Sequence, residues 1–141
     1  MSGTEDRDEA IYLAIEDILS LYAEIFGCTG RQAADQLRTR DGLESALARP
    51  SAYAHYQGAD LALQAAVLAH GIAEGQPFVE GNKRTALAAC LTFLAINGHR
   101  VSASQQERAS WILGLSEGDT PERLAERIRA SLVPIDGHDS Q

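Results

Sequence analysis

The sequence predicts an all-α fold of about five or six helices arranged around one central buried helix. Apolar residues recur every three to four positions along most of the 141-residue chain, which is the period of an amphipathic helix. Aromatic residues make up only 6% of the chain, which is low for a β-sandwich or a β-barrel. The apolar–polar alternation of strands is missing, except for a short strand that residues 100–102 could form.

The first expected helix covers residues 9–26 and is followed by Gly27 as a left-handed C-terminal cap. Residues 28–40 are polar and fit either a loop or a short helix. Residues 41–44, Asp-Gly-Leu-Glu, have the spacing of a capping box. We therefore expect a short helix there that ends before Pro50, because proline lacks a backbone donor and disfavours the helical conformation of the residue before it.

A connector over residues 51–59 leads to the most apolar part of the chain. Asp60 is expected to be the N-cap of a helix over residues 61–74. After a turn at residues 76–82, a helix that is apolar nearly all round runs to Asn97. Helices of this kind are buried on most sides, so this is the predicted central helix.

Two more helices complete the expected fold. Ser104 is expected to cap one that runs to Leu115. Residues 120–122, Thr-Pro-Glu, have the order of an N-cap, a proline at the first helical position and an acid in the first turn. The helix that follows presents apolar residues at helical spacing, among them Leu124 and Ile128.

The length of the chain is typical of one domain. We expect a single domain over residues 1–141 with an ordered core over about residues 9–133. The polar ends, residues 1–8 and 134–141, show no periodicity and are expected to be frayed tails.

Charge and composition exclude several classes of protein. The chain carries 12 Lys and Arg against 20 Asp and Glu, which gives a net charge of −8. This balance speaks against a nucleic-acid or membrane partner, because both need clustered cations. No apolar stretch approaches the length of a membrane span, and two cysteines are too few for a disulfide framework. The acidic N-terminus does not have the pattern expected of a signal peptide. We therefore expect a cytoplasmic protein.

The turn before the predicted central helix contains the candidate functional residues. Residues 76–85 read Gln-Pro-Phe-Val-Glu-Gly-Asn-Lys-Arg-Thr. Gly81 and Asn82 lead into the helix, where free N–H groups and the positive end of the helix dipole bind anions. Lys83 and Arg84 place two cations at that end, where they destabilise the helix unless an anion sits there.

Glu80 could hold a divalent cation beside such an anion, and Phe78 could anchor the turn in the core. These parts match phosphoryl or nucleotidyl transfer, which needs positioning, backbone donors, cations and a metal-binding carboxylate. An ordinary interhelical turn with two solvated cations is the alternative that these residues leave open. Residues 76–100 contain one acidic and three basic residues, so this segment is locally positive. The negative net charge of the whole chain therefore does not exclude a small polyphosphate ligand.

The same turn resembles the signature H-x-F-x-[DE]-[GA]-N-[KG]-R of the Fic/Doc (Fido) superfamily. Its Gly-Asn-Lys-Arg form, followed by Thr-Ala-Leu, is similar to the death-on-curing (Doc) branch. Residues 41–50 (DGLESALARP) and residues 93–98 (FLAING) resemble two further segments of that branch, so the ordered matches span about residues 11–117. The resemblance implies a single all-α Fido domain.

The resemblance also implies a role for each residue of the turn. Glu80 matches the carboxylate that binds Mg²⁺. Gly81 and Asn82 match the anion-hole positions that hold the phosphates of ATP, and Lys83 and Arg84 match the cations that clamp them.

Phe78 matches a structural anchor, and Gln76 stands at the position of the family's catalytic histidine. A neutral glutamine takes up no proton near pH 7, and losing a positioned general base typically costs about 10²–10⁴-fold in rate. The resemblance therefore implies impaired or lost catalysis. Two explanations are consistent with the glutamine at this position: a toxin that has been inactivated by substitution, and a natural variant with altered or lost chemistry. Leu87 stands where nucleotidylating members carry a second arginine, which favours the Doc branch.

Members of the Doc branch are toxins of toxin–antitoxin pairs. The founding type phosphorylates elongation factor Tu with ATP, and a neighbouring antitoxin folds over its active groove. The resemblance implies the same cofactors, ATP and Mg²⁺, and the same kinds of partner: a protein substrate and a cognate antitoxin. Two alternatives are a non-catalytic Fido module that binds a nucleotide or a peptide, and a nucleotidyltransferase that transfers AMP.

Overall fold

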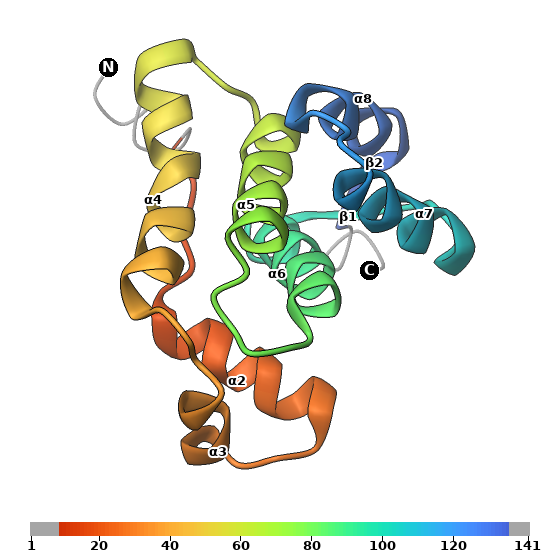
Figure 1. Cartoon of the computed structure of the whole chain (residues 1–141). Coiled ribbons are helices and arrows are strands. Elements are labelled where there is room, and N and C mark those ends of the chain that lie inside the picture. The colour runs from red at the N-terminus through yellow and green to blue at the C-terminus, as the bar shows by residue number, and fades with distance from the viewer. Residues whose placement is uncertain (1–8, 136–141) are drawn as a thin grey trace, which may run out of the picture.

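The structure, a computed structural model, describes residues 9–135 (Figure 1). Its described part contains seven helices and two short strands, so the all-α prediction is confirmed. The helix beyond the predicted number lies in the segment that the sequence left open, residues 28–40. The predicted frayed ends at residues 1–8 and 136–141 lie outside the described residues. The elements are α2 (Ile15–Phe26), α3 (Gly30–Asp35), α4 (Arg40–Gln57), α5 (Leu61–Gly75), α6 (Asn82–Ile96), β1 (His99–Val101), α7 (Gln105–Ser116), α8 (Pro121–Ser131) and β2 (Leu132–Pro134).

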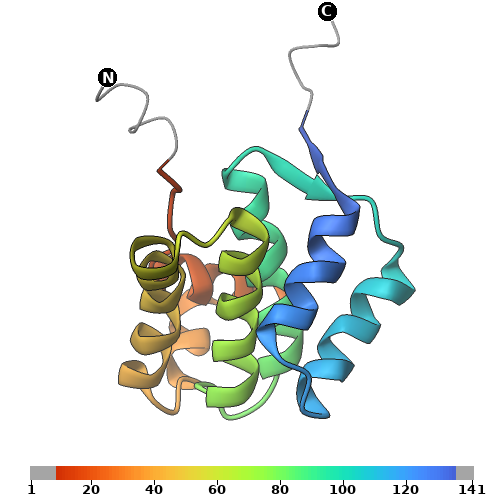
Figure 2. The ribbon, with the colours of Figure 1, turned by 90° about the horizontal axis from the view of Figure 1, so that it is seen from above.

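The helix at the centre of the fold is α5, where the sequence predicted α6. Seen from above, α4, α5 and α8 lie side by side, and α5 also packs against α6 and α7 (Figure 2). Nine residues of α5 are buried, compared with six of α6. Small side chains allow the close packing: a Cβ at Gly71 would lie 3.0 Å from the Cβ of Ala46 on α4. Being apolar all round thus marks α6 as a core helix without making it the central one.

The helix predicted to end before Pro50 instead continues through it to Gln57. Proline costs the helix one hydrogen bond, but Pro50 is fully buried and α4 packs along α5, so tertiary packing offsets that loss. The predicted capping box over residues 41–44 is wrong as well. Thr39 is the N-cap, and its hydroxyl accepts a hydrogen bond from the N–H of Gly42 at 3.0 Å.

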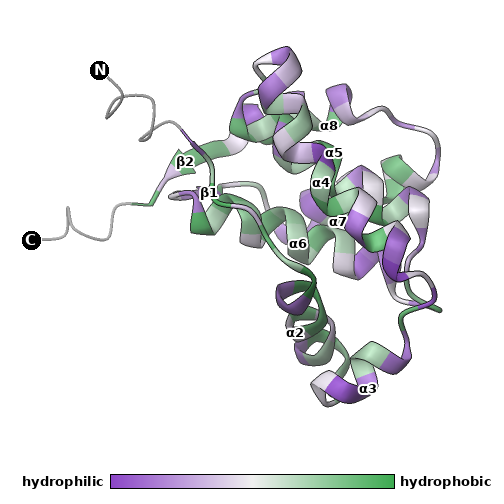
Figure 3. Cartoon of the chain, turned by 90° about the vertical axis from the view of Figure 1, so that its left-hand side faces the viewer, coloured by the Kyte–Doolittle hydropathy of each residue, from purple (hydrophilic) through white to green (hydrophobic). Residues whose placement is uncertain are grey.

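The first helix begins at Ile15, six residues later than predicted. The side-chain amide of Asn97 explains this, because it accepts from the N–H of Ile11 at 2.8 Å and donates to its carbonyl at 2.9 Å. That pairing occupies the backbone groups that a helix would use. Both α2 and α8 are amphipathic, with hydrophilic and hydrophobic residues along their lengths (Figure 3).

The strand expected at residues 100–102 is present one residue earlier, as β1, and it pairs antiparallel with β2. Part of the predicted C-terminal tail is therefore ordered. Pro134 lies in β2, and the N–H of Ile135 donates to the carbonyl of Gly98 at 2.8 Å. Proline is tolerated there because β2 is an edge strand.

The predicted N-caps Asp60, Ser104 and Thr120 are confirmed. The Asp60 carboxylate accepts from the N–H of Leu63 and forms two hydrogen bonds with the guanidinium of Arg129 on α8, at 2.7 and 2.9 Å. One side chain therefore caps α5 and ties it to α8. These bonds to Arg129 hold the pKa of Asp60 below its usual value.

Replacing Asp60 with alanine should lower the free energy of unfolding by about 1–2 kcal/mol at pH 7, through loss of the cap and of a half-exposed ion pair. Because the folded-state pKa is depressed, the part that comes from the ionised carboxylate is complete above the unfolded-state pKa of about 4 and is lost as the pH falls through the lower folded-state pKa. Urea unfolding at pH 7 and at pH 3 measures both effects. Asp60→Asn keeps the cap and should lose only the pH-dependent part; equal stability of Asp60→Ala and the unaltered chain at pH 7 would contradict the prediction.

Candidate functional site

The loop between α5 and α6 is closed by the side chain of Asn82. Its Oδ1 accepts a hydrogen bond from the N–H of Phe78 at 2.9 Å, and its Nδ2 donates to the carbonyl of Phe78 at 3.0 Å. Residues 78–82 are thereby held in a tight turn. The side-chain amide of Asn82 is thus engaged within the loop, and its backbone N–H in the first turn of α6 is left to face a ligand.

Phe78 is the predicted anchor, and the structure places it in the core with 1% of its surface exposed. Its ring stacks on that of Tyr22 from α2, with the centroids 4.3 Å apart. The Tyr22 hydroxyl donates to the carbonyl of Glu80 at 3.2 Å, so the same tyrosine holds the loop at a second point. Burial, and then the nearby Glu80 carboxylate, raise the pKa of Tyr22, which keeps this hydroxyl a donor at neutral pH.

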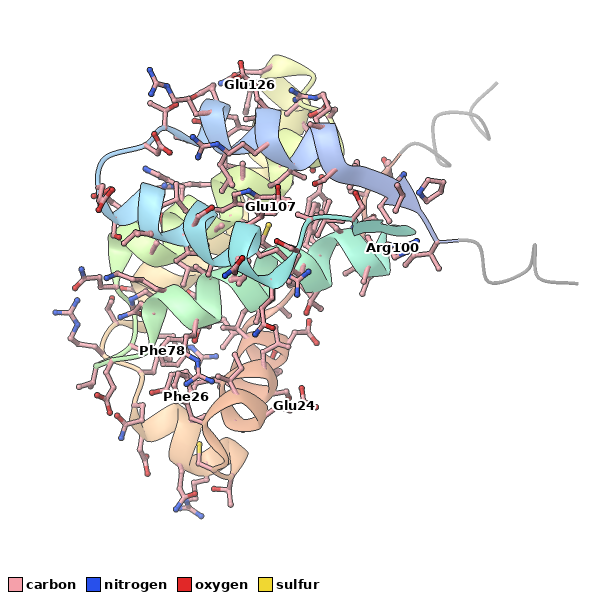
Figure 4. The ribbon with its side chains drawn as sticks, turned by 90° about the vertical axis from the view of Figure 1, so that its right-hand side faces the viewer. Glu24, Phe26, Phe78, Arg100, Glu107 and Glu126 are labelled. Atoms are coloured by element: carbon pink, nitrogen blue, oxygen red, sulfur yellow. The ribbon has the colours of Figure 1, made fainter. Side chains whose placement is uncertain are left out.

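Gly81 is the N-cap of α6 and adopts the left-handed conformation, with φ of 81°. A Cβ at this position would lie 2.4 Å from Cζ of Phe26, so the Phe26 ring leaves room for glycine alone. Figure 4 shows Phe26 and Phe78 close together beside the loop. The guanidinium of Arg84 lies over the Phe26 ring, 4.8 Å from its centroid. The buried Thr85 hydroxyl donates to the Gly81 carbonyl at 2.8 Å and locks the start of the helix.

A cavity of about 320 Å³ opens at this end of α6. Gly81 provides no side-chain cap, so the first-turn N–H groups of α6 are left for a ligand. Lys83 and Arg84 line the cavity, and neither forms an ion pair within residues 9–135. The structure thus brings five of the predicted site residues to one cavity, together with Ala73: Gln76, Gly81, Asn82, Lys83 and Arg84.

Glu80 does not join them. Its exposed carboxylate lines a neighbouring pocket of about 560 Å³ on the α2–α3 side, which Tyr22, Phe26 and Asp35 also line. No group of three or more potential metal ligands occurs among the described residues. Mg²⁺ is commonly held by one or two carboxylates together with substrate phosphates, so Glu80 suits such a shared site better than a cage built by protein alone.

A family model described as "Fic/DOC family" matches residues 12–94, which reach from just before α2 almost to the end of α6 and include the whole loop. The chain belongs to the Fic/DOC family. It is also similar to Toxin Doc of Mycolicibacterium smegmatis, with 40% identity in an alignment of 96 residues that covers 65% of this chain and 68% of that protein.

In this Fic/DOC chain, Gln76 ends α5 in an unusual backbone conformation. It is the C-cap of α5 and lies in the left-handed region, with φ of 47°. Its carbonyl accepts a hydrogen bond from Nη2 of Arg38 at 2.7 Å. Next to this hydrogen bond in the sequence, an isolated antiparallel bridge between Leu37 and Phe78 joins the segment before α4 to the loop between α5 and α6.

Three residues of the candidate site were not predicted from the sequence: Tyr22, Phe26 and Arg38. Tyr22 and Phe26 lie in the helix predicted over residues 9–26, where helical spacing marks them only as apolar positions. Arg38 lies in the segment to which the sequence assigned no structure, and only the fold brings it to residue 76. Among residues 9–135, no helix is both long and apolar enough to cross a bilayer.

Proposed function

We propose that this chain is a Doc-type toxin that binds ATP and Mg²⁺ at the start of α6 and whose reaction is phosphoryl transfer to a hydroxyl of a protein. The observation that supports this proposal most strongly is the cavity that joins the open N-terminus of α6 to Lys83 and Arg84, within the segment that matches the Fic/DOC family. Similarity to Toxin Doc supports the toxin part. We propose a translation factor such as elongation factor Tu as the protein substrate.

The chain's own groups suit the binding of a polyphosphate. The first-turn N–H groups of α6 donate hydrogen bonds to phosphoryl oxygens, and Gly81 lets the ligand approach the backbone closely. Lys83 and Arg84 neutralise the negative charge of the transferred group. Glu80, which lines the neighbouring pocket, would be the protein ligand of Mg²⁺, and the ion would supply further neutralisation of the phosphate charge.

Gln76 decides how much of the chemistry this chain retains. We propose that it occupies the general-base position, because it lines the cavity with both cations. Its carboxamide orients a hydroxyl by hydrogen bonding but takes up no proton near pH 7. Phosphoryl transfer has a loose transition state and depends mainly on positioning and charge, so a low rate of transfer is expected to remain.

The proposed setting is the cytoplasm, where ATP and a translation factor are both present, with a cognate antitoxin as the second protein partner. A partner that covers the cavity would shield the cations of Lys83 and Arg84, which have no internal carboxylate partner within residues 9–135. The chain's net charge of −8 favours proteins and small anions over nucleic acids as ligands.

Titration calorimetry with ATP and Mg²⁺ tests the binding part. Lys83→Met and Arg84→Met should each weaken binding by about 10–100-fold, because each removes a charge-assisted contact to phosphate. Arg100→Met is the matched control: it removes one positive charge beyond the far end of α6, about 20 Å from the cavity, and should leave the affinity unchanged (Figure 4). Absence of ATP binding to the unaltered chain would overturn the nucleotide-dependent function.

A second candidate is a binding module without catalysis, which the missing proton acceptor at Gln76 favours. Tight ATP binding with no transfer in the Gln76→His variant would support this candidate over the toxin. A third candidate is transfer of AMP. Label that enters the protein substrate from the γ-phosphate of ATP indicates phosphoryl transfer, whereas label from the α-phosphate indicates nucleotidyl transfer.

A further inference from the structure

Gln76 is held in a conformation that it would not adopt by itself. It is the only non-glycine residue with positive φ among the described residues. The left-handed region is unfavourable for side chains other than glycine, and glutamine is not among the types, such as Asn, Asp and His, that are enriched there. Contacts from the rest of the fold must therefore hold residue 76 in place.

The contacts come from the segment between α3 and α4. The N–H groups of Arg38 and Thr39 donate to the carbonyl of Pro77 at 2.6 and 3.1 Å, and the N–H of Val79 donates to the carbonyl of Gln36 at 2.8 Å. These three bonds hold the loop on either side of Phe78. The carbonyl of residue 76 itself is held by the Arg38 guanidinium, at 2.7 Å.

Electrostatics favour this contact. The last turn of α5 contains no basic residue, so nothing on α5 itself offsets the negative end of its dipole. Arg38 brings a positive charge to that end from another part of the chain. Its side chain is exposed and forms no ion pair within residues 9–135, so the bond to residue 76 is the contact by which that side chain is fixed.

We infer that Arg38 is a positioning residue for the cavity. By holding the carbonyl of residue 76, it maintains the left-handed turn that keeps the side chain of that residue at the cavity with Lys83 and Arg84. The catalytic part of this inference rests on the proposed function. The structural part, that Arg38 holds the backbone conformation of residue 76, can be tested without any activity. Arg38 itself does not line the cavity, so it acts through residue 76 and not on the ligand.

Transfer kinetics test the catalytic consequence. In a Gln76→His background, which supplies a proton acceptor, Arg38→Met should lower kcat about 10–100-fold, because small displacements of a reacting group have effects of this size. KM for ATP should change by less than about twofold, since the phosphate-binding groups are untouched. Arg38→Lys keeps a cationic donor and should recover part of kcat. Arg40→Met is the matched control, because Arg40 is exposed and pairs weakly with Glu44 at 3.9 Å.

Nuclear magnetic resonance gives the measurement that is independent of activity. In the unaltered chain and in Arg40→Met, a strong nuclear Overhauser effect between the amide and α protons of Gln76 should report the left-handed φ, because these protons lie closer together at positive φ. In Arg38→Met it should change, because the residue relaxes. An unchanged φ in Arg38→Met would overturn the inference, as would an unchanged kcat in an active Gln76→His background. An inactive Gln76→His protein would instead count against the proposed function, and φ alone would then decide the positioning role.

Discussion

Replacing Gln76 with histidine should raise the rate of transfer from ATP to the protein substrate by about 10²–10⁴-fold. An imidazole takes the proton from the attacking hydroxyl, which a carboxamide cannot do near neutral pH. The change should be tolerated, because histidine is several-fold enriched in the left-handed region that residue 76 occupies. Incorporation of γ-labelled phosphate into elongation factor Tu measures the rate, and growth arrest on expression gives a second readout.

Gln76→Asn is the control for this prediction. Asparagine is also enriched in the left-handed region but carries no base, so its rate should stay near that of the unaltered chain. The histidine variant should also become faster as the pH rises through about 6.5, because only the neutral imidazole accepts a proton, whereas the asparagine variant should not. A histidine variant no faster than the asparagine variant would show that residue 76 is not the position of the base.

Replacing Gly81 with alanine should lower the free energy of unfolding by about 2–5 kcal/mol, which combines the strain of the left-handed conformation with overpacking against Phe26. The added Cβ would lie 2.4 Å from the Phe26 ring, so the ring or the start of α6 must move. Urea unfolding monitored by circular dichroism measures the loss. ATP binding should weaken too, because the displaced N–H groups are those that line the cavity.

Gly58→Ala is the matched control. Gly58 also has positive φ, at 64°, but a Cβ there would meet nothing within 4 Å. It should therefore show only the conformational cost, about 1–2 kcal/mol. The difference between the two variants measures the clash with Phe26, and Phe26→Leu should recover part of that difference in the Gly81→Ala chain. Equal losses at both glycines would show that Phe26 does not restrict residue 81.

The sequence by itself determined the helical class and most helix starts. Asp60, Ser104 and Thr120 cap their helices as predicted, because each side chain bonds a backbone N–H only three residues further along the chain. The same holds for the residues of the loop, where Gly81 and the two cations that follow it are contiguous in sequence and meet at one cavity. Interactions that close within one helical turn depend mainly on local order, so a sequence pattern predicted these three caps, although the capping box predicted at residues 41–44 is wrong.

Only the tertiary structure decided the features that depend on distant segments. Burial carries α4 through Pro50, and Asn97 delays the start of α2 by pairing with Ile11. The fold also turns Glu80 towards a neighbouring pocket and brings Arg38 to residue 76. Each outcome depends on a contact between residues far apart in the chain or on burial by another element. Such contacts exist only once the helices have packed, so no local pattern of residues encodes them.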